Sequence, residues 1–181
     1  MRTEEIWQDK ILHQIIKKRF PPRIQQDLEN INTLKIPENV SSCYIYGDTN
    51  FGKTIYAAGL LLQEEKNLYL NNIIGDCVFI NMPEFFNDLR KSYQDVNVSE
   101  QEIIDYVMNA HLVILDDLTV DKPTDWLLGK LYLIINYRYE HLKKTIITNN
   151  ISLDAMAKLL GDSRITSRIK RQGKVLQKKH W

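Results

Sequence analysis

The chain has 181 residues, of which 44% are hydrophobic and 26% are charged, with only 7 Gly and 5 Pro. A chain of this length buries roughly 70% of its unfolded surface on folding, so we expect one globular unit that needs neither disulfides nor a structural metal; the composition excludes a collagen, a disordered tail and a multidomain enzyme. The 24 Lys and Arg nearly balance the 23 Asp and Glu, yet the segment from residue 163 onward holds basic residues and no acidic one. This basic end on an acidic body predicts a polyanionic partner or an acidic face on a neighbouring subunit, unless it is only a solvated tail.

Cysteine usage and hydropathy indicate the compartment. Cys43 and Cys77 lack the CxxC spacing of a metal or redox pair, so buried thiols in a reducing cytosol are expected. No apolar run approaches the roughly 20 residues of a membrane span, and acids stand at the N-terminus where a secretory signal carries basic and then apolar residues. We therefore expect a cytoplasmic protein.

The first part of the chain has the pattern of a helical extension. Residues 4–20 carry apolar side chains at helical spacing, and Pro21-Pro22 ends the pattern. This periodicity predicts an amphipathic helix, and a second helix is expected at 23–34. We assign residues 1–36 to an N-terminal helical extension.

From residue 37 to residue 181, short apolar strands alternate with helices. The strands are predicted at 43–46, 77–80, 112–115 and 145–148, and the helices at 53–65, 83–93, 99–110, within 124–143, at 152–160 and at 163–171, before a short tail at 174–177. Strands with few polar positions, separated by helices, are typical of a parallel sheet covered on both faces. The predicted fold class is therefore α/β, a three-layer sandwich.

The strongest local signal is a GxxxxGK[ST] match at residues 47–54, between a predicted strand and a predicted helix. Backbone N–H groups of such a loop converge on phosphate oxygens, and the helix N-terminus adds its dipole. Lys53 would reach the β- and γ-phosphates, Thr54 would offer its hydroxyl to Mg²⁺, and Asn50 replaces a common glycine with a residue that tolerates left-handed backbone angles. The predicted nucleotide-binding residues are Gly47, Asp48, Thr49, Asn50, Phe51, Gly52, Lys53 and Thr54.

A second signal is the apolar strand at 112–115 that ends in Asp116 and Asp117. After a phosphate loop, a carboxylate at the end of a parallel strand lies beside the phosphates and can hold the water shell of a metal ion. Asp116 is therefore predicted to bind Mg²⁺ together with Thr54. Asp117 is predicted to polarise the attacking water as a general base; the alternative is that it caps the following loop.

These motifs, together with TDWLLGKLYLIINYRYEHLKKTIITNN at 124–150 and RITSRI at 164–169, resemble the AAA+ ATPases of the DnaC/DnaI-like helicase loaders and the related IstB-like transposition helpers. The resemblance covers about residues 20–171, and the block at 135–150 is its most specific part. It implies a P-loop NTPase (AAA+) that binds and hydrolyses ATP with Mg²⁺ at interfaces of a homo-oligomer, contacts single-stranded DNA, and delivers or remodels a replicative DNA helicase. A transposition helper ATPase, a non-hydrolysing adaptor or inhibitor of a host loader, and a small-molecule P-loop kinase are the alternatives.

The resemblance also implies roles for single residues. Asn150, with Asn149 as the alternative, would orient the lytic water or read the γ-phosphate, since a strand-end amide points into the ligand crevice; its other interpretation is a helix cap. An arginine of RITSRI would be offered to the ATP of the next subunit, with Arg168 as first choice and Arg164 as second. Their spacing of four residues places both on one helix face, so spacing does not choose between them.

The predicted helix at 83–93 mixes rings with positive charge. Arg90, Lys91 and Tyr93 are predicted to contact single-stranded DNA by stacking and backbone contacts, whereas Phe85 and Phe86 are interpreted as core positions of an amphipathic helix. The pattern departs from the loaders twice. Only about 20 residues of helix stand where a helicase-binding domain is usual, so that helix is a reduced docking element or helicase contact is absent, and no lid domain with a second sensor arginine is expected after RITSRI.

Overall fold

The computed structural model describes residues 20–30, 35–92, 99–118 and 124–178. Tyr93 and nearly all of the predicted helix at 4–20 lie outside the described residues. The elements are α2 (Pro22–Asn30), β1 (Cys43–Tyr46), α3 (Lys53–Leu70), β2 (Cys77–Asn81), α4 (Met82–Ser92), α5 (Glu100–Asn109), β3 (Leu112–Asp116), α6 (Asp125–Glu140), β4 (Lys144–Asn149), α7 (Leu153–Leu160), α8 (Ser163–Gln172) and β5 (Lys174–Gln177). No described helix combines the length and the apolar character that a bilayer crossing needs.

The described strands form one parallel sheet in the order β2-β3-β4-β1-β5. Strand β4 lies between β1 and β3, with Asn149 opposite Tyr46 in the register. Because the strands are parallel, the segments that follow β1, β3 and β4 all emerge at the same edge of the sheet, the one formed by the carboxyl ends of the strands. The phosphate-loop motif, the two acids and the two asparagines are therefore brought to one edge, although the chain separates them widely.

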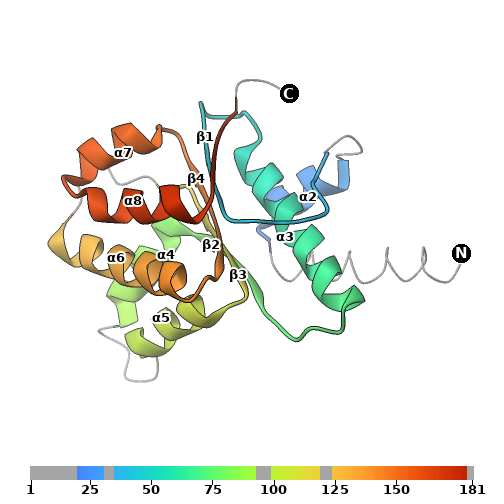
Figure 1. Ribbon diagram of the computed structural model, residues 1–181, viewed down its shortest axis with the longest axis horizontal. Helices are drawn as coiled ribbons and strands as arrows, with labels where there is room; N and C mark the ends of the chain where they lie inside the picture. The colour runs from blue at the N-terminus through green and yellow to red at the C-terminus, as the bar shows by residue number, and fades with distance from the viewer. Residues whose placement is uncertain (1–19, 31–34, 93–98, 119–123, 179–181) are drawn as a thin grey trace, which may run out of the picture.

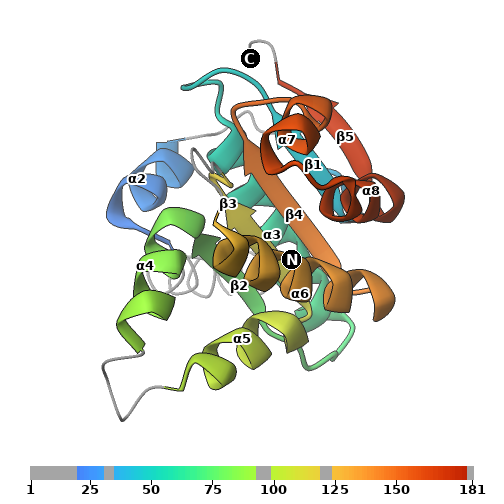
Figure 2. The same cartoon turned by 90° about the vertical axis from the view of Figure 1, so that its left-hand side faces the viewer.

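Helices cover both faces of this sheet, which confirms the three-layer α/β fold (Figure 1). Helices α2 and α3 cover one face, where Phe20 packs edge-on against Phe79 with ring centres 5.3 Å apart. Helices α4 to α8 cover the other face, which Figure 2 turns toward the viewer. Phe85 and Phe86 are 8% and 6% exposed and belong to this second core, so their interpretation as core positions is confirmed.

The fully buried Arg138 ties together the helices of the second face. It stands near the start of the most specific sequence block, and no sequence pattern identified it as a core residue. Its guanidinium donates to the carbonyls of Val107 (2.8 Å), Met108 (3.2 Å), Ala110 (2.9 Å) and Lys144 (2.5 Å) and to the hydroxyl of Thr145 (3.0 Å). Burial lowers the pKa of Arg138 to about 10. The side chain therefore satisfies the carbonyls that end α5 and fixes α5 and β4 against α6.

Two predicted boundaries are wrong. Helix α3 continues to Leu70 rather than ending at Glu65. The segment 174–177 is a strand and not a tail: the N–H of Lys174 donates to the carbonyl of Ser42 at 3.1 Å, and that of Lys178 to the carbonyl of Tyr46 at 2.7 Å. Only one of its four residues is even half-buried, so little apolar burial holds this strand in place. The backbone groups at the open edge of β1 supply the hydrogen-bond partners that make it a strand.

Candidate functional site

The loop between β1 and α3 adopts the backbone of a phosphate cradle. Gly47, Asn50 and Gly52 have φ values of 150°, 67° and 68°, so Asn50 adopts the left-handed conformation that the sequence indicated it would tolerate. Gly52 precedes α3 without a side-chain cap. The N–H groups of the first turn of α3 are therefore available to an anion at the helix N-terminus, and the exposed Asp48, Thr49 and Asn50 leave the loop accessible from solvent.

Lys53 lies inside this loop. Its ammonium donates to the carbonyls of Gly47 at 2.8 Å and Asp48 at 2.7 Å, and the residue is only 8% exposed. Burial lowers the pKa of Lys53, while the charges of Asp117 and Asp116 partly oppose that shift. The loop thus holds a cation at its centre, where phosphate oxygens would be its acceptors.

The end of β5 closes over the first glycine of the loop. A Cβ atom on Gly47 would lie 2.3 Å from the carbonyl oxygen of Lys178, so any larger residue at position 47 collides with backbone. The ammonium of Lys178 lies 4.0 Å from the ring centre of Tyr56 on α3. Sequence reasoning missed this contact because it interpreted the C-terminal segment as a tail.

Asp116 and Thr54 meet at the edge of the sheet. Oδ1 of Asp116 accepts hydrogen bonds from the hydroxyls of Thr54 at 2.8 Å and Thr148 at 2.7 Å, and the residue is 5% exposed. Burial raises the pKa of Asp116, and the two hydroxyl donors reduce this shift.

The residues at this edge fit the predicted magnesium ion. Hydroxyl and carboxylate oxygens are the ligands that Mg²⁺ prefers, and Mg²⁺ commonly takes one or two protein ligands, with waters and phosphates completing its shell. Within the described ranges, no cluster of three or more His, Cys, Asp or Glu side chains offers a protein-only metal cage. Thr54 and Asp116 would hold the ion.

Thr148 is a site residue that sequence reasoning missed. Its hydroxyl donates to Asp116 and accepts the N–H of Asp117 at 2.9 Å. Asp117 has a φ of 53°, a conformation that is uncommon for a residue other than glycine. Thr148 therefore fixes the position of both acids. The only sequence signal for Thr148 was its place two residues before Asn150, which ends the block at 135–150.

The two asparagines at the end of β4 have different surroundings: Asn149 is the last residue of the strand, and Asn150 follows it. Asn149 is 1% exposed; its amide donates to the carbonyl of Leu118 at 2.6 Å, and its Oδ1 accepts the N–H of Asn150 at 2.7 Å and of Ile151 at 3.2 Å. The half-buried Asn150 instead turns its Nδ2 toward Oδ1 of Asp117, 3.5 Å away. Asn149 shapes the turn, and the side chain of Asn150 lies beside the predicted general base.

Arg164 and Arg168 lie on α8, across the sheet from α3 (Figure 1). The guanidinium carbons of both residues lie 4.9 Å from the ring centre of Tyr132. Arg168 also contacts Asn136 through Nε and the hydroxyl of Tyr132 at 3.0 Å. Arg164 is more exposed and binds Asp162 through Nε and Nη2 at 2.7–3.1 Å, and these hydrogen bonds lower the pKa of Asp162. The structure thus brings the two arginines together on one ring, on the other face of the sheet from the helix that carries Lys53 and Thr54.

Two of the three predicted DNA-contacting residues, Arg90 and Lys91, lie on α4. Arg90 and Lys91 are exposed. The guanidinium carbon of Arg90 is 5.6 Å from the ring of Trp126, and Lys91 pairs with Asp88 at 3.2 Å. The exposed side of their helix thus carries two basic residues in its last turn and two acidic residues, Glu84 and Asp88, before them, while its phenylalanines face the core.

Comparison with known proteins identifies the family. The profile described as IstB-like ATP binding protein matches residues 9–179. The chain belongs to this family. No curated protein matches it. Among solved structures, the chain is similar to the DnaC helicase loader, with 28% identity over 87% of this chain and 86% of that chain and a TM-score of 0.61.

Two further structures share the fold. DnaI is 22% identical over 87% of this chain and 84% of that chain, with a TM-score of 0.66. AMPPCP-bound DnaA from Aquifex aeolicus is 18% identical over 86% of this chain and 44% of that chain, with a TM-score of 0.60. The predicted resemblance to DnaC/DnaI-like and IstB-like proteins and the P-loop AAA+ fold are thereby confirmed.

Proposed function

We propose that the protein is an ATP-dependent helicase loader: a homo-oligomer that binds and hydrolyses ATP between subunits, contacts single-stranded DNA, and delivers or remodels a replicative DNA helicase. The observation that carries the proposal is the cluster of Lys53, Thr54, Asp116, Asp117 and Asn150 at one edge of the sheet. The similarity to the DnaC helicase loader over most of both chains supports helicase loading as the process in which the protein acts.

Each residue of this cluster has a chemical task. The loop N–H groups and Lys53 would bind and orient the phosphates, and Thr54 with Asp116 would hold Mg²⁺, which screens charge on the phosphate oxygens. Asp117 would accept a proton from the attacking water, and Asn150, whose amide lies 3.5 Å from the carboxylate of Asp117, would hold that water in line.

The arginines would complete the site of the neighbouring subunit. Both lie on α8, across the sheet from α3 (Figures 1 and 2), so their position favours action in trans. Arg168 is already oriented by Tyr132 and Asn136, whereas Arg164 would have to leave Asp162. We therefore keep Arg168 as the finger and Arg164 as the alternative. Positive charge supplied by a second subunit makes hydrolysis depend on assembly.

Single-stranded DNA would contact the outer side of α4. Arg90 and Lys91 would bind its phosphates, with Tyr93 as the stacking ring. Replacing both basic residues by serine is expected to weaken binding of a fluorescent oligothymidine and to reduce its salt dependence. Unchanged affinity would remove this face from the proposal.

ATP turnover per protomer, measured against protein concentration with and without single-stranded DNA, tests the enzymatic part. Turnover should rise with protein concentration. The Lys53→Ala variant should lose ATP binding, while Arg168→Ala should keep binding and lose the concentration-dependent turnover. Arg171→Ala, also exposed on α8, is the matched control and should behave like the native chain. Retained turnover in both Lys53→Ala and Arg168→Ala would overturn the assignments.

A transposition helper ATPase is the second candidate, and the IstB-like family match favours it. It uses the same nucleotide site, so turnover does not separate the two. A helper of this kind is expected to prefer and bend double-stranded DNA and to bind a transposase, whereas a loader is expected to prefer single strands and to bind a helicase. Binding to paired 40-mer probes, single- and double-stranded, distinguishes them.

A further inference from the structure

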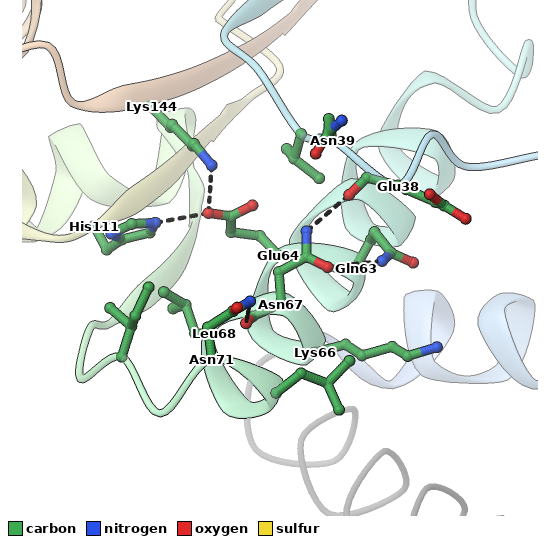
Figure 3. Close-up of a pocket in the computed structure, with 13 residues that line it drawn as sticks. Glu38, Asn39, Gln63, Glu64, Lys66, Asn67, Leu68, Asn71, His111 and Lys144 are labelled. Atoms are coloured by element: carbon green, nitrogen blue, oxygen red, sulfur yellow. Dashed lines mark hydrogen bonds and ion pairs between the residues drawn. The ribbon is translucent and has the colours of Figure 1, made fainter.

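A pocket lies at the opposite end of the sheet from the phosphate loop (Figure 3). It has a volume of about 660 Å³, within the range of pockets that hold ligands. Its walls come from the segment before β1, the last turns of α3 and the starts of β3 and β4. The lining residues are Glu38, Asn39, Val40, Gln63, Glu64, Lys66, Asn67, Leu68, Leu70, Asn71, Ile73, His111 and Lys144.

A buried carboxylate forms the floor of this pocket. Only 3% of the Glu64 side chain is exposed, and its Oε1 accepts from Lys144 at 2.5 Å and contacts Nε2 of His111 at 2.7 Å. Burial would raise the pKa of Glu64, but the hydrogen bonds from Lys144 and His111 outweigh burial and hold it below its usual value. The carboxylate is therefore ionised at neutral pH.

The second oxygen of Glu64 is the unusual feature. Within the described part of the chain, Oε2 is buried and has no hydrogen-bond partner. Figure 3 shows it turned away from Lys144 and His111, toward the side of the pocket that carries Asn39. A buried acceptor without a donor is costly, and native proteins hold few of them. The lining of the pocket thus holds a buried acceptor whose missing partner a ligand N–H would supply.

The walls of the pocket are held in place before any ligand arrives. The amide of Asn67 donates to the carbonyl of Glu38 at 2.8 Å and ties the segment before β1 to α3. Helix α3 ends in a Schellman motif, in which the N–H of Ile73 donates to Leu68 at 2.9 Å and Asn72 takes a φ of 55°. This turn fixes Ile73 at the mouth of the pocket.

The mouth continues into an apolar surface. Tyr69, Leu70, Ile73 and Ile74 are 56%, 60%, 53% and 102% exposed, and they account for four of the nine exposed large hydrophobic residues of the described chain within one six-residue stretch. Clustered exposed apolar side chains beside a polar pocket are typical of a protein-binding surface. They extend beyond the pocket itself, so a small molecule inside it would leave them exposed.

We propose that this pocket binds an extended segment of a partner protein, whose main-chain N–H donates to Glu64 and whose apolar side chain packs on Leu70 and Ile73. The ammonium of Lys66 and the carboxamide of Asn39, both exposed in the lining of the pocket, would donate to carbonyls of the same segment. The site thus matches the alternating donors and acceptors of a peptide backbone. The pocket is at the amino ends of the strands, so the partner can bind while the nucleotide site is occupied. The inference is independent of the proposed function.

The test uses N-acetyl-leucine N-methylamide as a probe, because this compound carries two peptide N–H groups, two carbonyls and one apolar side chain. It is titrated into the ¹⁵N-labelled full chain in the presence of Mg·ATP. A probe of this size should bind with a Kd of about a millimolar. Amide shifts should concentrate at residues 64–73, 111 and 144. Shifts elsewhere only, or no shifts at millimolar probe, would overturn the proposal.

Matched variants and a matched probe sharpen the result. Leu70→Glu should weaken binding of the probe at least about tenfold. Leu159→Glu is the control, because Leu159 is also an exposed leucine in a helix, α7, and this change should leave the affinity for the probe unchanged. Glu64→Gln, which replaces one acceptor oxygen with a donor, should also weaken binding of the probe. If that buried variant does not fold, the comparison of Leu70→Glu with Leu159→Glu still tests the proposal. N-acetyl-glycine N-methylamide should bind several-fold more weakly than the leucine probe, and equal binding of the two would refute a role for the apolar surface.

Discussion

Thr148→Val tests the bridge that holds the two acids of the nucleotide site. Valine has nearly the shape of threonine, so the change leaves no cavity and keeps a β-branched residue in β4. It removes the hydroxyl that donates to Asp116 at 2.7 Å and accepts from the N–H of Asp117 at 2.9 Å. The hydrogen bond to a carboxylate contributes about 1.5–3 kcal/mol. Leaving the backbone N–H of Asp117 without its acceptor costs about 1 kcal/mol more. This value is at the low end for an unpaired donor because Asp117 is only half-buried.

The expected loss in the free energy of unfolding is therefore about 2.5–4 kcal/mol. Urea unfolding at pH 7, followed by the fluorescence of tryptophans that include the partly buried Trp126, measures it. Thr148→Ser is the control: it keeps both hydrogen bonds and should cost about 1 kcal/mol or less. Mg·ATP affinity should fall in the valine variant and persist in the serine variant. If Val and Ser differ by less than about 0.5 kcal/mol, the bridge does not stabilise the site and the reasoning fails.

Three further outcomes follow from burial and charge. Asp116→Asn should raise the free energy of unfolding at pH 7: burial raises the pKa of Asp116 above its usual 3.8, so the ionised native form loses stability as pH rises through the native pKa. In urea unfolding from pH 4 to 8, the free energy of unfolding of the variant should change less with pH than that of the native chain. The variant should also lose Mg·ATP binding. A lower free energy of unfolding for the variant at pH 7 would contradict this reasoning. Arg138→Met should cost about 3–5 kcal/mol by the same assay, because it leaves buried carbonyls without donors, and a loss below 1 kcal/mol would show that water replaces the guanidinium. Burial raises the pKa of the Cys43 thiol to about 12, so Cys43 and the fully buried Cys77 should react with a thiol reagent at pH 8 only on unfolding, and fast labelling of the native chain would disprove their burial.

Most of the fold was predictable because its signals are local. The apolar runs at 43–46 and 112–115 and the glycine spacing of 47–54 fix strands and a loop from neighbouring residues alone, and their order predicted a parallel sheet. The end of α3 was less visible, since the chain continues as a helix-compatible sequence past Glu65 and stops only where Asn72 takes a left-handed conformation. Boundaries of this kind depend on a single turn residue.

The sequence by itself determined that a phosphate loop and a strand-end acid are present and that they belong to an AAA+ type P-loop fold. Only the tertiary structure decided which groups share the site: β4 lies between β1 and β3, and that placement brings Thr148 to Asp116 and Asn150 to Asp117. It also laid the end of β5 over Gly47. The physical reason is that neighbours in a parallel sheet are chosen by crossover connections and by open strand edges, which long stretches of chain separate and which no local spacing records.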